Sequence, residues 1–351
     1  MITVHSDPAF VFTSADVSCD VGKLLSRADL VKIAEAKSMK HALELLRDFG
    51  YNDGKDMDTE KGFNYYIDQE QLKYHKLINE IVFHREELRL FLIPRDYHNL
   101  KVIIKAEFLD IDPEPLMVET GSFGIKELIG LVKGRNYMFF SAIKKRAIME
   151  ATETFSKTGD PQEIDIIFDK ACWAEMYEAA KRNGAETLVD EVDEVTDIEE
   201  PFMVEYVRKK IDLNNLDAFL RLKYMKRPKD FYKKVFLPEG NVSWNTFSSV
   251  YDEPMASLGD ALAPYGYKYI IDECGKEIME TGSFAKFEEL YDNNVIRMLR
   301  EEKYEPYGIA STVAFLLSKD DEIRQLRMIF TWLHQGRSAK EIGESLRDSY
   351  V

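Results

Sequence analysis

The stretch DLNNLDAFLRLKYM, residues 212–225, occurs in nearly the same form three times along the chain. DYHNLKVIIKAEF, residues 96–108, lies 116 positions earlier, and EIRQLRMIFTWLH, residues 322–334, lies 110 positions later. Each copy has an acidic residue, two variable positions, Asn or Gln, and then Leu, with apolar residues three and four places further on. That spacing is typical of one face of an α-helix. Recurrence at a nearly constant interval predicts one structural unit used three times.

The segments that precede the three copies also correspond. They share apolar residues around an acidic turn of helix and read KGFNYYIDQEQLKYHKLINEIV, DPQEIDIIFDKACWAEMYEAAK and SFAKFEELYDNNVIRMLREEKY. We therefore predict three related helical units, 1–112, 113–227 and 228–351, with Leu100, Leu216 and Leu326 at equivalent buried positions. The alternative is that three long helices share a leucine-rich start by chance.

Most of the remaining sequence also has helical periodicity. Helices are predicted over residues 37–51, 69–92, 124–151 and 161–182. The last of these has Asp160 as its N-cap and Pro161 in its first turn, and it is expected to end at Asn183-Gly184. Short strand candidates such as YKYIID, from Tyr267, are too few to build a sheet. The sequence predicts an all-α protein.

A glycine turn followed by a serine recurs after the first two copies. VETGSF, residues 118–123, and LPEGNVSW, residues 237–244, each pair a glycine with a serine that can cap the next short helix. A second ETGSF, residues 280–284, precedes the third copy instead of following the second. It has a different phase, so we do not count it as part of the repeat.

The charge balance restricts the classes of partner. The formal charge is −16 and the isoelectric point is about 5.0. Binding to nucleic acid requires clustered Lys and Arg, so the charge balance argues against this class of partner. Adhesion of the chain to anionic lipid headgroups is disfavoured for the same reason. Basic protein surfaces remain as possible partners.

Cysteine usage and hydropathy favour a reduced compartment and no membrane span. Cys19, Cys172 and Cys274 are far apart and form no CxxC pair, which favours buried, reduced thiols in a cytosolic chain. Residues 1–20 contain no Lys or Arg, unlike a signal peptide. The longest apolar stretches, such as the one starting at Gly308, are about half the roughly 20 residues that a spanning helix needs.

No catalytic, cofactor-binding or metal-ligating residues are predicted. The sequence contains no GxxxxGK[ST] phosphate loop, no GxGxxG and no HExxH, so direct nucleotide binding is not expected. The histidines have no metal-ligand spacing and include His41 and His75, which we interpret as ordinary packing or surface residues. NDGKDMD, residues 52–58, lacks the order of a calcium loop, and a solvated turn is preferred. Glu86 and Glu87 are adjacent and belong to no recognisable acid–base site.

An ordered set of motifs resembles one known family. EPYGIASTVAFLLSKDDEIRQLRMIFTWLHQGRSAKEIGESLRDSYV, residues 305–351, has the apolar helix, the E-I-R-x-L-R helix and the L-R-x-x-Y-V ending of the C subunit of bacterial and archaeal V-type (A-type) ATPases. Further matches are DLNNL at 212, GDPQEIDIIFDKACW at 159 and NLKVIIKAEF at 99. The eukaryotic counterpart of this family is the d subunit of the vacuolar proton pump. The acidic first twenty residues depart from the family, which usually opens with a helix of small residues.

The resemblance implies a fold and a mechanical role. It implies a funnel of three similar helical units with pseudo-threefold symmetry, placed on the cytoplasmic face of the membrane ring of proteolipid subunits. The tip of the central shaft, formed by the D and F subunits, would enter its mouth. The implied function is that of a non-catalytic rotor subunit in ATP-driven ion transport or ATP synthesis, without a cofactor. The alternative is a free-standing helical-repeat scaffold that binds soluble protein partners.

Two sets of polar residues allow both a structural and a functional interpretation. In the repeated helices, Asp96, Asp212 and Glu322 are expected to be N-caps, and the residues three positions on, Asn99, Asn215 and Gln325, to bond to backbone groups. We favour this structural role over a ring of shaft-binding residues. The acidic run at 189–200 is interpreted as a solvated linker or helix end, with an acidic rim for a basic partner as the alternative.

Overall fold

The computed structural model describes residues 24–84, 86–118, 121–189, 202–301 and 309–347, and every regular secondary-structure element among these residues is a helix. The all-α prediction is confirmed. The strand candidate that starts at Tyr267 lies instead at the start of helix α13, Lys268–Thr281, whose buried side chains recur every three or four residues, as one face of a helix requires. In the described part of the chain, every helix is too short or too polar to cross a lipid bilayer.

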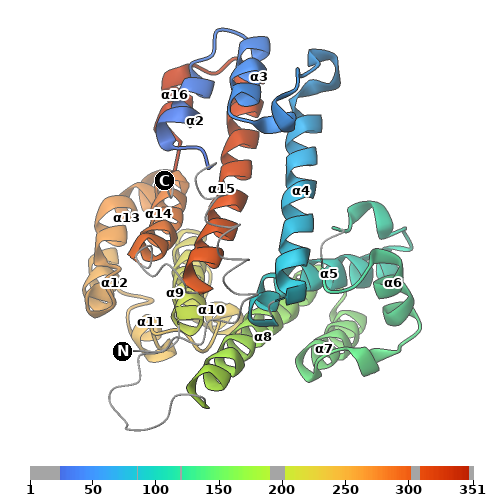
Figure 1. The fold of residues 1–351 in the computed structure, drawn as a ribbon. Coiled ribbons are helices and arrows are strands. Elements are labelled where there is room, and N and C mark those ends of the chain that lie inside the picture. Colours follow the sequence, from blue (N-terminus) through green and yellow to red (C-terminus); the bar gives the residue numbers. More distant parts are fainter. Residues whose placement is uncertain (1–23, 85, 119–120, 190–201, 302–308, 348–351) are drawn as a thin grey trace, which may run out of the picture. The chain divides into compact units, whose positions relative to one another are not determined.

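The helices form two compact units (Figure 1). Unit 1 combines two segments that are distant in sequence, Met1–His84 and Glu288–Val351, and unit 2 is the continuous segment Arg85–Phe287. Leu100 and Leu216 of unit 2 and Leu326 of unit 1 are all at most 1% exposed, so the predicted burial of the three leucines is confirmed. The division into three superposable units stays a prediction.

Unit 2 is built around two long helices, α8, Pro161–Val189, and α9, Phe202–Tyr224. Helix α8 packs against α5, Ile93–Leu109, α7, Ala142–Thr158, and α9. The shorter elements are η3, Glu86–Phe91, η4, Glu114–Leu116, α6, Ile125–Lys133, η5, Tyr137–Phe139, α10, Lys229–Val235, α11, Trp244–Ser249, α12, Met255–Leu262, η6, Ala263–Tyr265, and α13.

Aromatic residues fill the space between α9 and the segment that follows it. The rings of Phe219 and Tyr232 meet edge to face with centroids 5.4 Å apart, and Phe247 lies 5.9 Å from Phe219. These three side chains are at most 1% exposed. Offset and edge-to-face aromatic pairs stabilise such a cluster beyond the effect of buried area alone. The cluster holds α10 and α11 against the C-terminal half of α9.

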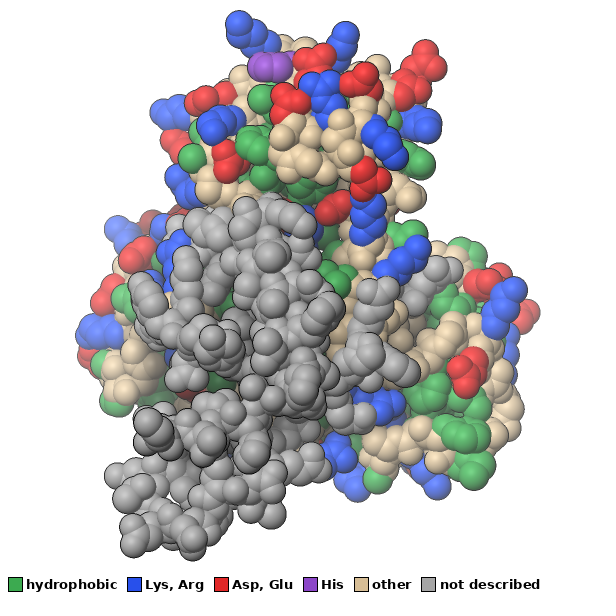
Figure 2. Space-filling model, viewed as in Figure 1, with side chains coloured by type: hydrophobic (Ala, Val, Ile, Leu, Met, Phe, Trp, Pro, Cys, Tyr) green, Lys and Arg blue, Asp and Glu red, His purple; other side chains and the backbone are tan. Residues whose placement is uncertain are grey.

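Unit 1 has helix α15, Ile309–His334, at its centre. Helix α4, Gly62–His84, runs alongside α15, and α2, Arg27–Ala34, α3, Met39–Asp48, and α16, Ala339–Glu344, also contact α15 (Figure 1). The remaining elements are η1, Tyr51–Gly54, η2, Thr59–Lys61, and α14, Ala285–Glu301, whose first residues belong to unit 2. Acidic and basic side chains intermingle on the visible surface of α2, α3 and α16 (Figure 2).

Two of the predicted helices are interrupted. The segment predicted as one helix over 124–151 contains three elements: α6, which ends before Gly134, the short helix η5, and α7. Arg135 has a positive φ of 54°, which no helix accommodates, and the Ser141 hydroxyl accepts the backbone N–H of Lys144 to start α7. The helix predicted over 69–92 ends as α4 at His84, and η3 follows.

The ends of α8 were predicted with mixed success. The Asp160 carboxylate accepts the backbone N–H of Gln162 at 2.9 Å, as expected of an N-cap. The predicted stop at Asn183-Gly184 is wrong, because α8 continues to Val189. A single glycine costs a helix only about 1 kcal/mol, and the next residues, Ala185-Glu-Thr-Leu, include good helix formers that allow it to continue.

Candidate functional site

Two buried polar side chains on α5 hold the loop that follows this helix. Asn99 receives the backbone N–H of Val118 at 2.9 Å and donates to its carbonyl oxygen at 2.8 Å. One turn earlier, the Asp96 carboxylate accepts the backbone N–H of Ser122 at 2.6 Å. Asp96 and Asn99 are at most 1% exposed, so these bonds replace the water that the loop backbone would otherwise need. We call this pair of residues and the loop they hold the α5 clamp.

Helix α9 carries the same arrangement. Asn215 accepts the backbone N–H of Leu237 at 2.8 Å and donates to its carbonyl oxygen at 2.8 Å. Asp212 accepts the backbone N–H of Val242 at 2.9 Å. The residues have the same three-residue spacing as Asp96 and Asn99, and they bond to a loop at a similar distance along the chain. We call this arrangement the α9 clamp.

A glycine in each loop allows the close approach of the carboxylate. A Cβ atom on Gly121 would lie 2.4 Å from the nearer oxygen of Asp96, and one on Gly240 would lie 2.4 Å from the nearer oxygen of Asp212. Neither glycine has a positive φ. These positions therefore need glycine because of the space that the acid occupies, and not because of backbone conformation.

The third copy, on α15 of unit 1, differs in detail. Gln325 accepts the backbone N–H of Arg347 at 3.0 Å, 22 positions further on, as Leu237 is from Asn215. Glu322, which is longer than aspartate, receives the backbone N–H of Leu25 and the hydroxyl of Tyr51. The acidic side chain of this copy therefore bonds to residues from near the start of the chain.

The predicted roles of these polar residues are partly confirmed. The three amides, Asn99, Asn215 and Gln325, bond to backbone groups as expected. The expectation that the acids are N-caps is wrong: Asp96 lies in the first turn of α5, and Asp212 and Glu322 lie well inside α9 and α15. Inside α9 and α15, the backbone N–H groups are already paired within the helix, so the carboxylates of Asp212 and Glu322 bond to other segments. All six side chains are buried, so they cannot form an exposed shaft-binding ring.

The two clamps of unit 2 neutralise their aspartates differently. The second oxygen of Asp96 makes no hydrogen bond and faces the ammonium nitrogen of Lys144 at 3.2 Å. Lys144 also donates to Glu175 at 2.8 Å. The second oxygen of Asp212 instead accepts the hydroxyl of Tyr267 at 3.3 Å. Burial raises the pKa of Asp212 to about 6, against the opposing effect of its hydrogen bonds.

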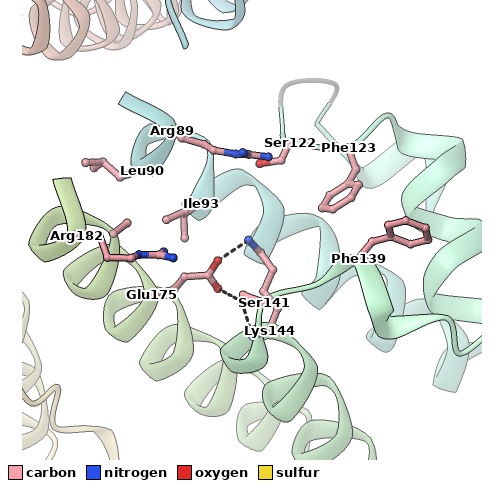
Figure 3. A pocket seen from close by; sticks show the side chains of 11 residues that line it. Arg89, Leu90, Ile93, Ser122, Phe123, Phe139, Ser141, Lys144, Glu175 and Arg182 are labelled. Atoms are coloured by element: carbon pink, nitrogen blue, oxygen red, sulfur yellow. Dashed lines mark hydrogen bonds and ion pairs between the residues drawn. The ribbon is translucent and has the colours of Figure 1, made fainter. Parts of the chain in front are cut away.

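The polar network around Glu175 forms one wall of a cavity of about 350 Å³ (Figure 3). One oxygen of Glu175 accepts the hydroxyls of Tyr97, at 2.7 Å, and Ser141, at 2.8 Å, and the other accepts Lys144. Burial and the nearby carboxylate of Glu175 raise the pKa of Tyr97. Because the carboxylate oxygens and the ammonium group are bound to one another, this wall holds α5, α7 and α8 together and offers no activated nucleophile or base.

Arg89, Arg182, Ser122 and apolar side chains form the rest of the cavity. Phe123 and Phe139 lie on one side of it and Leu90 on another, as Figure 3 shows. Among the described residues, no group of three or more His, Cys, Asp or Glu side chains is placed to hold a metal ion. The bonds of Glu175 to Tyr97, Ser141 and Lys144 support the packing of α5, α7 and α8.

The comparison of the sequence with protein families identifies the class of protein. The family model described as ATP synthase (C/AC39) subunit matches residues 17–345, which is nearly the whole chain. The chain belongs to this family. The match includes both clamps of unit 2 and the third copy on α15.

The relatives of this C/AC39 chain that are described next have low sequence identity to it but a similar length. The C subunit of the A-type ATP synthase of Pyrococcus abyssi is 21% identical, over 95% of this chain and 89% of its own length. The C subunit of the V-type sodium ATPase of Enterococcus hirae is 22% identical, over 93% and 95%. The C subunit of the A-type ATP synthase of Methanothermobacter thermautotrophicus is 23% identical, over 95% and 85%.

The structure tests the predictions made for two cysteines and two serines of this C/AC39 chain. Cys172 and Cys274 are buried free thiols, as expected, and burial raises the pKa of both, that of Cys274 to about 12. Ser243 caps α11 as predicted. Ser122 does not cap α6: Gly124 is the N-cap, without a side-chain cap bond, and the backbone N–H of Ser122 donates to Asp96 instead.

Other predictions fall on turns or outside the described residues. In the 52–58 turn, Asp53 forms an exposed ion pair with Lys73 at 2.8 Å, and Asn52 and Asp53 have positive φ. The imidazole of His41 accepts the backbone N–H of Lys37 at the start of α3. Cys19 and all but the first residue of the acidic run at 189–200 lie outside the described residues.

Sequence reasoning missed the side chains that contact the clamps or their network. No role as a partner of these acids was predicted for Lys144, Glu175 or Tyr267. A signal for Lys144 exists, since it falls in helical phase with the buried residues Ala147, Ile148 and Ala151 of α7. A lysine on an apolar face indicates a buried acidic partner, although sequence does not show which acid that is.

Proposed function

We propose that this chain is a non-catalytic rotor subunit of a V-type or A-type ion-translocating ATPase, which joins the central shaft to the membrane proteolipid ring. The observation that carries the proposal is the family match across residues 17–345. Relatives of similar length, named as the C subunits of A-type ATP synthases or of a V-type sodium ATPase, support it. The expected partners are the D and F subunits of the shaft and the ring, with the chain peripheral to the membrane on its cytoplasmic face.

The packing inside each unit suits a part that transmits torque. A coupling must deform little under load, and close-packed helical interiors have low compressibility. In unit 2, the α5 and α9 clamps fix loops through bonds to both the N–H and the carbonyl group of one residue, Val118 or Leu237. Each clamped loop thus moves with its helix, which supports a mechanical role without requiring any chemistry.

The joints to the shaft and the ring need not be as tight as a domain core. A rotor subunit is held by several contacts at once, so modest individual affinities add up to a firm hold. The net charge of −16 favours basic surfaces on the partners. Complementary charge would orient the subunit during assembly more than it would strengthen the finished joint.

The proposal is tested by reconstituting the ATPase without this chain. The catalytic head should still hydrolyse ATP, because the nucleotide sites are expected on other subunits, but ATP-driven ion uptake into vesicles should be absent. Adding the purified chain should restore uptake. A matched control is the Gly130→Ala chain, since a Cβ at this exposed position of α6 meets no atom within 4 Å; it should restore uptake equally well.

Full ion uptake in the verified absence of the chain would contradict the proposal. It would favour the alternative of a free-standing helical scaffold that binds soluble partners. Quantitative mass spectrometry of the vesicles establishes that the chain is absent. ATP hydrolysis measured in the same vesicles separates loss of coupling from loss of the head.

A further inference from the structure

The last residues of α5 and the loop that links α5 to α6 expose several large apolar side chains. Leu109 is 67% exposed, Leu116 is 57% and Ile111 is 49%, and Phe108 and Val118 are each 36% exposed. All five lie within eleven residues, 108–118. Hydrophobic side chains are also visible over the part of unit 2 formed by α5, α6 and α7 in Figure 2. Such a concentration of exposed apolar side chains is typical of an interaction site.

Hydrogen bonds hold the backbone of this loop in one conformation. The exposure of its apolar side chains therefore follows from the fold. Asp110 ends α5 with a positive φ of 52°, and its N–H bonds to the carbonyl oxygen of Ala106. Asp112 accepts the N–H of Glu114 at 3.1 Å. The far end is held by the bonds of Asn99 to Val118. The α5 clamp therefore maintains a surface that exposes apolar groups to water.

The charges of the loop are of one sign. Asp110, Asp112 and Glu114 alternate with the apolar residues and are exposed, and residues 106–118 contain no Lys or Arg. A surface with both apolar and acidic groups complements a segment that has both apolar and basic groups.

The corresponding segment of the α9 clamp has the opposite character. Residues 225–237 contain five Lys or Arg residues and one acid, Asp230. Within this segment, α10 buries Tyr232 completely, and Met225 is the one large apolar residue that is strongly exposed, at 61%. Two segments held by the same kind of clamp thus differ in charge, and they differ in the number of large exposed apolar residues, which is five in residues 108–118 and one in residues 225–237. The requirements of the clamp do not explain the exposed residues of the α5–α6 loop.

We propose that residues 108–118 form a docking surface for a basic segment of a partner protein, with Leu109, Ile111 and Leu116 contacting apolar side chains of that segment. The acids steer the approach of the segment and set its orientation, and the apolar contacts slow its dissociation. The proposal concerns this surface only and holds whether or not the partner belongs to a rotary ATPase.

Photo-crosslinking in cells tests this surface in the full chain. Leu116 is replaced by p-benzoylphenylalanine, and Met225, which is 61% exposed at the end of α9, is replaced in the same way as a matched control. After irradiation, the crosslinked peptide is sequenced by mass spectrometry. We expect the chain with the probe at 116 to crosslink to a protein segment that has a net positive charge and apolar residues, and the control at 225 to give a different product or none.

A second variant examines the role of charge without disturbing the loop. Asp112→Asn and Glu114→Gln together remove two negative charges, and the asparagine introduced at position 112 retains an oxygen that accepts the N–H of residue 114. The crosslinking yield at 116 should fall about tenfold, which corresponds to about 1.4 kcal/mol, while circular dichroism and the melting temperature stay unchanged. Crosslinking at 116 to an acidic segment or to lipid, the same product at 225, no product, or an unchanged yield in the charge variant would each overturn the proposal.

Discussion

At the scale of single residues, the two clamps of unit 2 differ in what surrounds the acid. Asp96 has the ammonium group of Lys144 at 3.2 Å, whereas Asp212 has the hydroxyl of Tyr267 at 3.3 Å. A phenol donates a hydrogen bond but brings no charge to offset the desolvation of a buried carboxylate. The ionised form of Asp212 therefore lowers the free energy of unfolding, and the size of this effect depends on pH.

The first prediction concerns this pH dependence. The pKa of Asp212 in the folded chain is about 6, above its ordinary value of 3.8, so the folded state binds a proton more tightly than the unfolded state. The free energy of unfolding therefore falls as pH rises from about 4 to about 6, and this contribution is constant above that window. The Asp212→Asn variant should lack this fall. The difference between the free energies of unfolding of the variant and of the original chain should therefore shift in favour of the variant by about 2–3 kcal/mol from pH 4 to pH 7.

Urea unfolding of both chains at a series of pH values measures this difference. The contribution of Asp321, whose pKa burial also raises to about 6, is present in both chains and cancels. The asparagine introduced at position 212 retains an oxygen for the N–H of Val242 and gains an amide that can bond to the oxygen of Tyr267. Parallel stability curves for the two chains across the window would contradict the prediction.

The second prediction concerns the glycine of the α9 clamp. In Gly240→Ala, the new methyl group would lie 2.4 Å from the Asp212 oxygen and 3.0 Å from Ile211, so the loop must move and the bond to Val242 must lengthen. We expect a loss of about 1–3 kcal/mol in the free energy of unfolding. Gly130→Ala on α6 is the control, with a gain of about 0.5–1 kcal/mol because alanine favours the helix. Equal effects of the two substitutions would exclude a special role for Gly240.

Some of these residue roles were predictable from the sequence. The amides Asn99 and Asn215 were expected to bond to backbone groups, because short polar side chains in a repeated position compete for such groups. The partners of these amides could not be predicted. Val118 and Leu237 are apolar residues, and they take part through their backbone N–H and carbonyl groups, which the sequence does not distinguish. The contact between Lys144 and Glu175 was not predicted either, because a salt bridge between residues 31 positions apart leaves no pattern in the sequence.

At the scale of elements, α9 connects the clamp to the core of unit 2. Its residues Asp212 and Asn215 face the clamped loop, while Leu216, Phe219 and Leu220 are buried among apolar neighbours. Disruption of this helix therefore affects both the loop and the aromatic cluster around Phe219.

The third prediction is that Leu216→Pro breaks α9. Proline removes a backbone hydrogen bond and clashes with the preceding turn, which costs about 3 kcal/mol or more. Loss of helical signal at 222 nm and a lower urea midpoint would register the effect. The control is Leu216→Met, which conserves volume and should cost less than about 1.5 kcal/mol. A proline variant as stable as the methionine variant would show that α9 does not organise unit 2.

The sequence predicted the existence of helices better than their ends. Long periodic segments such as α3 and α8 were identified, since apolar spacing reports directly on a buried face. The break between α6 and α7 was missed, although Gly134 and Asn136 lie there, because apolar residues continue through it as Tyr137-Met-Phe-Phe. Hydropathy shows that such a segment is apolar but not that Arg135 adopts a positive φ.

At the scale of the whole molecule, membership of the C/AC39 family implies a protein whose work depends on others. The fourth prediction is that the isolated chain neither binds nor hydrolyses Mg-ATP. Calorimetric titration should give no saturable heat, because no phosphate-binding loop occurs in the sequence. A binding isotherm with a defined stoichiometry would contradict this prediction, and the purified catalytic head serves as the positive control.

The all-α class could be derived from the sequence, but the division into two compact units could not. The repeat of Leu100, Leu216 and Leu326 predicted three units in chain order, and their superposition stays a prediction. The compact units instead unite α4 with α15, which are more than 200 residues apart. Periodicity identifies the apolar face of each helix, but it does not identify the helix that covers that face.

The discontinuous composition of unit 1 has a consequence for synthesis on the ribosome. Helices α2, α3 and α4 emerge early, but α15, which packs against all three, follows after unit 2. At about 5–20 residues per second, translation of the intervening roughly 200 residues takes about 10–40 s. During this interval, the nascent chain carries uncovered apolar faces of α2 to α4 beside a unit 2 that can already fold. We therefore expect nascent chains that are stalled once Phe287 has left the ribosome, but before α15 has emerged, to have a protease-resistant unit 2 and to recruit chaperones through residues 24–84.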